Sequence, residues 1–261
     1  MNEICKNCQN TITENFCGNC GQKKFKRIDK KYVFDEIQYL ALHTNKGFFY
    51  SIKKILRNPG KTAKEFIDGN RVNHYKPILL ALVLGGLTSF ISFKIMHSEK
   101  IVNDLFSDEF GVLKTDGRMK DFMDSYMNIF SSYYSLIMLS TVPFFSLAGY
   151  WAFKKWRYNY FESIILNTYF YIYYTLIGLI ITPLNYLGVK FNFSPMILPS
   201  ISLLATPFLL YWFYKGTNPE KHSSEIIVNL LKFYLLLALI FIVIYLLLII
   251  SVVIYVVLTK L

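Results

Sequence analysis

Long apolar segments dominate the chain from residue 78 onward. Each is about as long as the roughly 20 residues that an α-helix needs to cross the hydrocarbon core of a bilayer, or longer. We place five predicted spans near Ile78–Met96, Ile129–Phe153, Ser163–Pro183, Phe193–Tyr214 and Phe233–Leu258. The pattern therefore predicts an all-α polytopic membrane domain over residues 77–261.

The segment before the first span, residues 32–76, has an amphipathic pattern instead. It is predicted to form helices that are interrupted near Asn45 and Gly47. After that interruption, apolar residues share one helix face and basic residues the opposite face: Phe48, Phe49, Ile52, Ile55 and Leu56 against Lys53, Lys54 and Arg57. A basic amphipathic helix next to a span is typical of a helix that lies in the membrane interface. Packing against the N-terminal segment is the alternative.

Pro59 and Gly60 are predicted to stop this amphipathic helix, because proline has no amide proton to donate and glycine frees the backbone. A second short helix is expected over Lys61–Asp68, with Gly69 at its left-handed C-terminal position. We therefore expect residues 46–76 to lie along the membrane surface as helices, bent at Pro59 and Gly60.

All four cysteines of the chain lie within residues 1–22, as two C-x-x-C pairs: Cys5 with Cys8, and Cys17 with Cys20. Zn²⁺ binds four thiolates in a tetrahedron, and each C-x-x-C turn offers two of them. The spacing predicts a structural zinc ribbon that folds on its metal, because so short a segment cannot bury a useful core. Two disulfides, a redox pair and an iron–sulfur centre are the alternatives. Four thiolates would leave no open position for a catalytic water.

Basic residues are concentrated before the first span, and the chain has a net charge of +11. Residues 23–31 form a polybasic linker, which suits a bilayer with anionic headgroups. Because basic residues mark the cytoplasmic side of membrane proteins, we expect no nucleic-acid partner. Basic and less basic connections alternate along the chain, which predicts a cytoplasmic N-terminus and an external C-terminus. The first 30 residues lack the apolar core of a signal peptide, so the N-terminus is expected to remain in the mature protein.

Two sets of polar residues are candidates for ligand contact. One set directly precedes the first span and suits a ligand, a lipid headgroup or a simple interfacial anchor: Arg71, His74, Tyr75 and Lys76. The other is a polar stripe in the third span that includes Asn167 and Tyr171. Such a stripe serves either an intramembrane site or contacts between helices. Charged residues lie near the ends of the spans, so no charge at depth indicates an ion path.

Three motifs, FCGNCGQ, GFFYSIKKILRNPGK and FIDGNRVNHYKP, resemble an uncharacterised bacterial family defined by a domain of unknown function. The resemblance covers residues 1 to about 85 and continues beyond them mainly as topology. It implies a multi-pass protein of the bacterial inner membrane with a zinc ribbon, and it implies no activity. The stretch NYFESIILNTYFYIYYTLIGLI loosely resembles the third span of the Yip family, which likewise has five spans and a cytosolic N-terminus.

The sequence contains no glycine-rich nucleotide loop and no G-x-S-x-G or H-E-x-x-H motif. We therefore expect a non-enzymatic membrane protein whose zinc ribbon and amphipathic helices form a docking or regulatory platform for a cytoplasmic protein partner. A transporter or channel for a small or lipid-like solute is the alternative, with Asn167 and the neighbouring tyrosines on its path. A lipid-modifying enzyme that uses Arg71, His74 and Lys76 is a third hypothesis.

Overall fold

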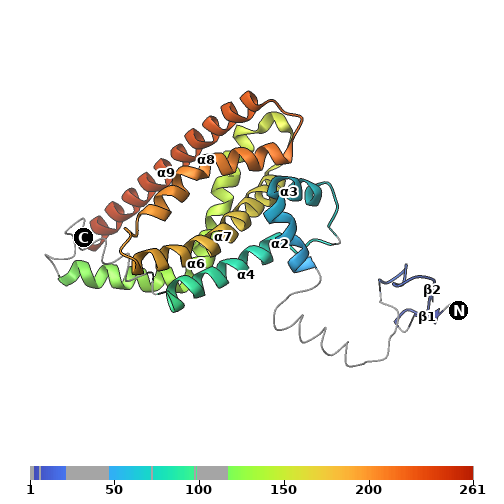
Figure 1. Ribbon diagram of the computed structural model, residues 1–261. Helices are drawn as coiled ribbons and strands as arrows, with labels where there is room; N and C mark the ends of the chain where they lie inside the picture. Colours follow the sequence, from blue (N-terminus) through green and yellow to red (C-terminus); the bar gives the residue numbers. More distant parts are fainter. Residues whose placement is uncertain are drawn as a thin grey trace. The chain divides into compact units, whose positions relative to one another are not determined.

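The computed structural model describes residues 3–5, 7–21, 47–71, 73–96, 98 and 117–260 (Figure 1). The chain divides into two compact units, Met1–Asn45 and Lys46–Leu261. The predicted polybasic linker 23–31 and the first amphipathic segment, up to Asn45, lie outside the described residues.

The described residues of the N-terminal unit include a two-stranded antiparallel sheet. Strands β1 (Glu3–Ile4) and β2 (Thr11–Ile12) pair with Glu3 opposite Ile12 and Ile4 opposite Thr11. Its buried hydrophobic residues in the described part are Cys5, Ile12 and Cys17. A cluster of this size buries too little apolar surface to offset the conformational entropy of folding, so the unit depends on its cysteines for stability.

The regular elements among the described residues of the second unit are all helical. Its elements in chain order are α2 (Gly47–Arg57), α3 (Pro59–Ile67), α4 (Pro77–Ser89), the π-helical turn η1 (Phe90–Ile95), α6 (Gly117–Ala152), the 3₁₀ turn η2 (Lys154–Trp156), α7 (Tyr160–Lys190), α8 (Ile197–Thr217) and α9 (Ser223–Lys260). The prediction of an all-α membrane fold with a cysteine cluster near its N-terminus is confirmed.

Five helices in the described part of the chain are long and apolar enough to cross a membrane: Pro77–Ile95, Ser125–Ala152, Tyr160–Lys190, Ile197–Thr217 and Ser223–Ser251. The predicted number of spans is confirmed. The third span was expected to end at Pro183, but Pro183 lies inside α7, which continues to Lys190. Proline is tolerated within membrane helices because neighbouring groups and local adjustments satisfy the backbone that it frees. Pro143 and Pro207 are accommodated in the same way within α6 and α8.

α7 is the central helix of the bundle. It packs against α2, α3, α4, α6 and α8, whereas α9 packs against α6 and α8. The largest fully buried side chains of the core are aromatic, and they come from three of the spans: Tyr169, Phe213 and Phe233. Because five spans alternate in direction, the start of α4, the end of α6, the start of α7, the end of α8 and the start of α9 share one end of the bundle. This end is called the α3 end below.

α2 and α3 form a helical hairpin on the α3 end, against α7 and α8 (Figure 1). The turn between them differs from the prediction that Pro59 and Gly60 separate the helices. Asn58 is the separating residue, and its side-chain Oδ1 accepts a hydrogen bond from the Lys61 amide at 2.9 Å. Pro59 is the first residue of α3, a position where the missing amide proton costs nothing. The second helix therefore begins two residues earlier than expected.

The end of α3 agrees with the prediction for Gly69. This residue has a φ of 104°, and its amide donates to the Phe66 carbonyl at 3.3 Å. The following amide, of Asn70, donates to the Glu65 carbonyl at 3.0 Å. These paired bonds are the Schellman arrangement, which satisfies carbonyls at the end of a helix and turns the chain toward α4.

Two glycines let α3 and α8 approach each other to backbone contact. A Cβ atom on Gly60 would lie 1.9 Å from the Phe213 carbonyl oxygen and 2.8 Å from the Thr217 nitrogen. A Cβ atom on Gly216 would lie 2.5 Å from Asn58 Oδ1. Small residues at crossings bring membrane helices close enough for extensive van der Waals contact. The hairpin is thus held directly against the bundle.

Candidate functional site

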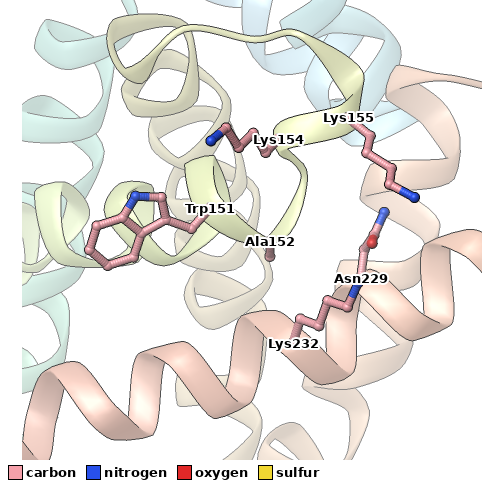
Figure 2. A pocket seen from close by; sticks show the side chains of 6 residues that line it. All are labelled: Trp151, Ala152, Lys154, Lys155, Asn229 and Lys232. Atoms are coloured by element: carbon pink, nitrogen blue, oxygen red, sulfur yellow. The ribbon is translucent and has the colours of Figure 1, made fainter.

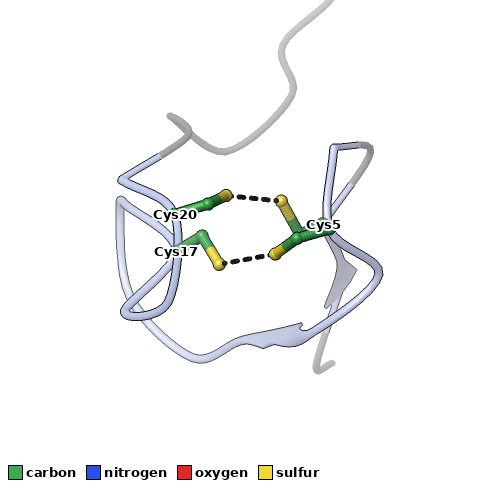
Figure 3. Close-up of side chains that lie close together, drawn as sticks. Cys5, Cys17 and Cys20 are labelled. Carbon is green, nitrogen blue, oxygen red and sulfur yellow. Dashed lines mark hydrogen bonds between the residues drawn. The ribbon is translucent and has the colours of Figure 1, made fainter.

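The four cysteines form one cluster in the N-terminal unit. The Sγ atoms of Cys5 and Cys20 lie 3.6 Å apart, and those of Cys8 and Cys17 lie 3.5 Å apart. All four Sγ atoms lie within 4.8 Å of one another. Figure 3 shows the sulfur of Cys20 facing that of Cys5, and the Cys17 sulfur faces that of Cys8. None of the four is in a disulfide.

Equivalent backbone turns present the two cysteine pairs. After the second cysteine of each pair, the next residue has a positive φ, 61° at Gln9 and 73° at Gly21. The Gln9 amide donates to the Cys5 carbonyl at 3.0 Å, and the Gly21 amide donates to the Cys17 carbonyl at 2.9 Å. Each turn folds back on its own first cysteine and points both sulfurs inward.

This donor set fits a metal ion. Four sulfurs at about 2.3 Å from a tetrahedral zinc stand about 3.8 Å from one another, close to the two separations above. Thiolate ligands suit zinc and iron and are poor ligands for magnesium or calcium. The cluster could therefore hold a metal ion with all four positions occupied by the protein.

The residues predicted to contact a ligand before the first span do not share one environment. His74 and Tyr75 are buried, whereas Arg71 and Lys76 are exposed. The Tyr75 amide donates to Ser51 Oγ of α2 at 2.8 Å, and its ring packs edge-on against Phe48. These contacts make Tyr75 part of the core between the hairpin and α4.

Arg71 is bound to the end of α3. Its Nε donates to the Phe66 carbonyl at 3.0 Å, and its guanidinium lies over the Phe66 ring at 5.4 Å. A cation at a helix C-terminus also interacts favourably with the helix dipole. Its observed contacts are those of a helix cap.

His74 belongs to a small charged group formed with Lys54 of α2 and Glu65 of α3, called the Glu65 cluster below. Lys54 Nζ donates to Glu65 Oε2 at 3.3 Å, and His74 Nε2 lies 3.9 Å from the same oxygen. Neither His74 ring nitrogen has a hydrogen-bond partner among the described residues. Aromatic rings of Tyr50 and Phe66 stand edge-on to the imidazole.

The environment of this cluster sets its protonation. Burial lowers the pKa of His74, although the Glu65 carboxylate opposes that effect and Lys54 reinforces it. The hydrogen bond and charge of Glu65 raise the pKa of Lys54. His74 is therefore neutral at pH 7, and one Lys54–Glu65 ion pair links the two helices of the hairpin. The sequence pattern predicted only that Lys54 lies on the basic face of an interfacial helix, and it gave no indication of Glu65, because their pairing depends on the turn at Asn58.

The intramembrane polar residues lie at contacts between helices. Asn167 is buried, and its amide nitrogen donates to the Ser163 carbonyl at 2.9 Å. A Cβ atom on Gly149 would lie 3.3 Å from Asn167 Nδ2 and 3.3 Å from the Tyr214 hydroxyl, so α6, α7 and α8 meet there.

Tyr171 stands one turn further along α7. Its hydroxyl would lie 2.8 Å from a Cβ atom on Gly85 of α4, next to Ser135 of α6. Asn167 and Tyr171 thus fill two successive close approaches between spans.

Residues 45–89 match the model of a family described as a protein of unknown function (DUF3667). The matched stretch covers the α2–α3 hairpin and α4, and it includes the Glu65 cluster and Gly60. The match agrees with the resemblance to an uncharacterised family over these residues and does not extend to the cysteines. No curated protein and no solved structure matches the chain.

Proposed function

We propose that this protein is a non-enzymatic platform in the bacterial inner membrane, with a structural zinc ribbon that docks or regulates a cytoplasmic protein partner. The cytoplasmic side would be the α3 end of the bundle, where Lys154, Lys155 and Lys215 add positive charge to the turns. On this proposal the polybasic linker and the exposed basic residues of α2 contact anionic headgroups.

One observation carries the docking role. The ribbon exposes two large apolar side chains, Ile4 at 65% and Phe16 at 57% of their full accessible area. They occupy equivalent positions, because each directly precedes the first cysteine of its pair. On a unit this small, two outward apolar residues supply the kind of contact that buries well against a partner.

The hairpin supports the same proposal by giving the platform a rigid base. The inward face of α2 carries Phe48, Ser51 and Ile55, which are buried. Its outward face carries the exposed Phe49 and Leu56 beside the basic Lys53. The prediction that Phe49 and Leu56 share the apolar face opposite Lys53 is therefore wrong. This outward face suits the boundary between headgroups and acyl chains. The hairpin would lie in the interface while α8 holds it in place.

Metal analysis tests the zinc assignment. The purified chain should contain about one zinc per chain, because four thiolates complete a tetrahedral site. A Cys17→Ser/Cys20→Ser variant should lose nearly all of it, since two ligands cannot retain a structural ion against washing. Iron in place of zinc would make the ribbon an iron–sulfur unit. An unchanged metal content in the variant would exclude the cysteine cluster as the site.

Partner capture tests the docking role separately from folding. Membranes containing the tagged full chain are crosslinked, and the captured proteins are compared among the wild type, Phe16→Ser and Glu14→Gln. Glu14 is also exposed on the ribbon, so its variant is the matched control. A specific partner should be captured by the wild type and the control and be reduced severalfold by Phe16→Ser, with equal zinc content in all three. Equal capture by Phe16→Ser would contradict docking through this surface.

Reconstitution distinguishes the platform from the transporter. Liposomes carrying the full chain should show no solute flux above protein-free liposomes on the platform hypothesis. Flux that persists in Phe16→Ser and falls in Asn167→Leu would favour a transporter with its path along α7.

A further inference from the structure

A pocket of about 430 Å³ opens at the α3 end of the bundle, away from the hairpin residues discussed above. It lies between the end of α6 with the η2 turn and the first turns of α9 (Figure 2). Six residues line it: Trp151, Ala152, Lys154, Lys155, Asn229 and Lys232.

The lining of this pocket is strongly basic. Three of the six residues are lysines, and no carboxylate is among them. None of the three lysines makes an ion pair with any residue that the structure describes. The acidic residue one turn before Asn229, Glu225, accepts a hydrogen bond from Trp156 Nε1 at 2.8 Å and lies 3.9 Å from Lys221 Nζ. The Glu225 carboxylate therefore interacts with residues that do not line the pocket.

Asn229 gives the pocket a specific hydrogen-bond donor. Its side chain is only 5% exposed, and its Nδ2 has no hydrogen-bond partner in the described part of the chain. In the view of Figure 2, its amide group points toward the Lys155 side chain. Burying an amide donor without an acceptor is costly, so such a group indicates an acceptor that the protein itself does not provide. An acceptor placed between Asn229 and these lysines would be anionic.

The depth of the pocket in the membrane points to the same class of ligand. Lys232 directly precedes the apolar run that begins at Phe233, and Trp151 is exposed near the end of α6. Tryptophan and lysine at the end of a span are typical of the headgroup region. Lipid phosphates and dissolved phosphate esters both reach this depth.

We propose that Lys154, Lys155, Lys232 and Asn229 form a binding site for a phosphate group, carried by an anionic lipid or by a soluble phosphate. The lysine ammonium groups neutralise the charge, and the Asn229 amide donates to one phosphate oxygen. Trp151 packs beside the glycerol or acyl portion if the ligand is a lipid. The site depends on neither the ribbon nor a protein partner.

Lipid titration of the full chain in nonionic detergent tests the site, with native mass spectrometry as the readout. Phosphatidylglycerol is the probe, and phosphatidylcholine is the comparison lipid. Affinity for the first phosphatidylglycerol should fall about fivefold for each lysine removed in Lys155→Gln/Lys232→Gln, as expected for basic residues at an anionic surface. Lys94→Gln/Lys190→Gln removes the same charge from exposed positions at the opposite end of the bundle and should change that affinity less than twofold.

Asn229→Leu separates a specific site from general electrostatic attraction, because it leaves the net charge unchanged. Phosphatidylglycerol affinity should fall roughly tenfold, as expected for the loss of a hydrogen bond to a charged group. The lysine variant is altered only at exposed side chains, so it keeps the test decisive if Asn229→Leu does not fold.

Inorganic phosphate distinguishes the two sources of the ligand. If phosphatidylglycerol binds and millimolar phosphate does not displace it, the ligand is a lipid headgroup. If phosphate raises the thermal stability of the wild type but not of Lys155→Gln/Lys232→Gln, and the two lipids bind equally, the ligand is a soluble phosphate. Equal responses of Lys155→Gln/Lys232→Gln and Lys94→Gln/Lys190→Gln to both probes would overturn the proposal.

Discussion

Gln9 and Gly21 occupy equivalent positions after the two cysteine pairs, yet only one of them is a glycine. Both have a positive φ, which an L-residue with a Cβ atom adopts at a cost of roughly 1–2 kcal/mol. The first turn therefore stores strain that the second avoids. Gly21 is recognisable in the sequence as a residue suited to such a turn, whereas Gln9 carries no signal for a left-handed backbone.

Single substitutions at these two positions should have different effects on metal affinity. Gly21→Ala should weaken zinc retention by roughly 1 kcal/mol, since its Cβ would meet no atom within 4 Å and the cost is conformational. Gln9→Gly should leave affinity unchanged or strengthen it slightly, because relief of strain is offset by the freedom of glycine in the unfolded chain. Chelator competition measures both. Gly18→Ala, whose φ is not positive, is the control and should change affinity less than Gly21→Ala.

His74 makes the hairpin sensitive to acid. Because its folded-state pKa lies below the ordinary value of about 6.5, the unfolded chain binds the proton more readily. Its contribution to stability is fully present above about pH 6.5 and is lost as the pH falls from there toward the folded pKa. The charged groups that face His74 are Glu65 and Lys54.

Thermal unfolding of the purified chain between pH 7 and pH 5 checks this expectation. The wild type should lose stability over that interval, whereas His74→Phe should show a flatter profile. Phenylalanine keeps the ring contacts with Tyr50 and Phe66 and has no proton to gain. Identical pH profiles for the two proteins would assign the acid sensitivity to other groups.

Elements are positioned by contacts that their own sequences reveal only in part. Apolar length predicts the spans because backbone groups in lipid must bond within the helix, which makes the signal local. The hairpin turn at Asn58 depends on helix capping. The Asn58 side chain caps the start of α3, so that Pro59 begins a helix and does not end one. The contact between Gly60 and Gly216 joins residues far apart in the chain, so no local pattern could predict it.

A methyl group at Gly60 should force α3 away from α8. The Cβ of Gly60→Ala would overlap the backbone of Phe213 and Thr217, and neither atom belongs to a flexible side chain. Overpacking of this kind costs about 1–3 kcal/mol, with a lower unfolding temperature in detergent as the readout. Gly86→Ala in α4 is the matched control, since its Cβ meets no atom within 4 Å. The control should be neutral or slightly stabilising, because alanine favours helix more than glycine does.

At the scale of the whole molecule, the five candidate spans predict that the two termini lie on opposite sides of the membrane. Span number follows from hydropathy alone, whereas orientation rests on the distribution of lysine and arginine. The Glu65 cluster and the pocket lined by Lys154, Lys155 and Lys232 could not be predicted from the sequence, because each combines residues from separate helices. Lys154 and Lys155 were visible in the sequence only as a basic turn, and Asn229 carried no signal at all.

Reporter fusions check the predicted orientation. A fusion after Leu261 should report the exterior, and one after Lys155 should report the cytoplasm, because basic turns are retained inside. The fusion after Lys155 is also a control for expression, since it precedes α7. A cytoplasmic signal from the C-terminal fusion would mean that the orientation is the reverse of the predicted one or that one of the five helices does not cross the membrane.

α9 is longer than the hydrocarbon core of a typical bilayer is thick. Its 38 residues extend roughly 57 Å at 1.5 Å per residue, against a hydrocarbon core of about 30 Å. The apolar run that follows Lys232 alone extends roughly 40 Å, so the helix must tilt, or the bilayer must thicken around it. Because α9 packs against α6, a change in tilt would alter the spacing between Lys155 and Lys232 across the basic pocket. Hydrophobic mismatch would then couple membrane thickness to phosphate binding. The affinity of the pocket would depend on the thickness of the surrounding bilayer.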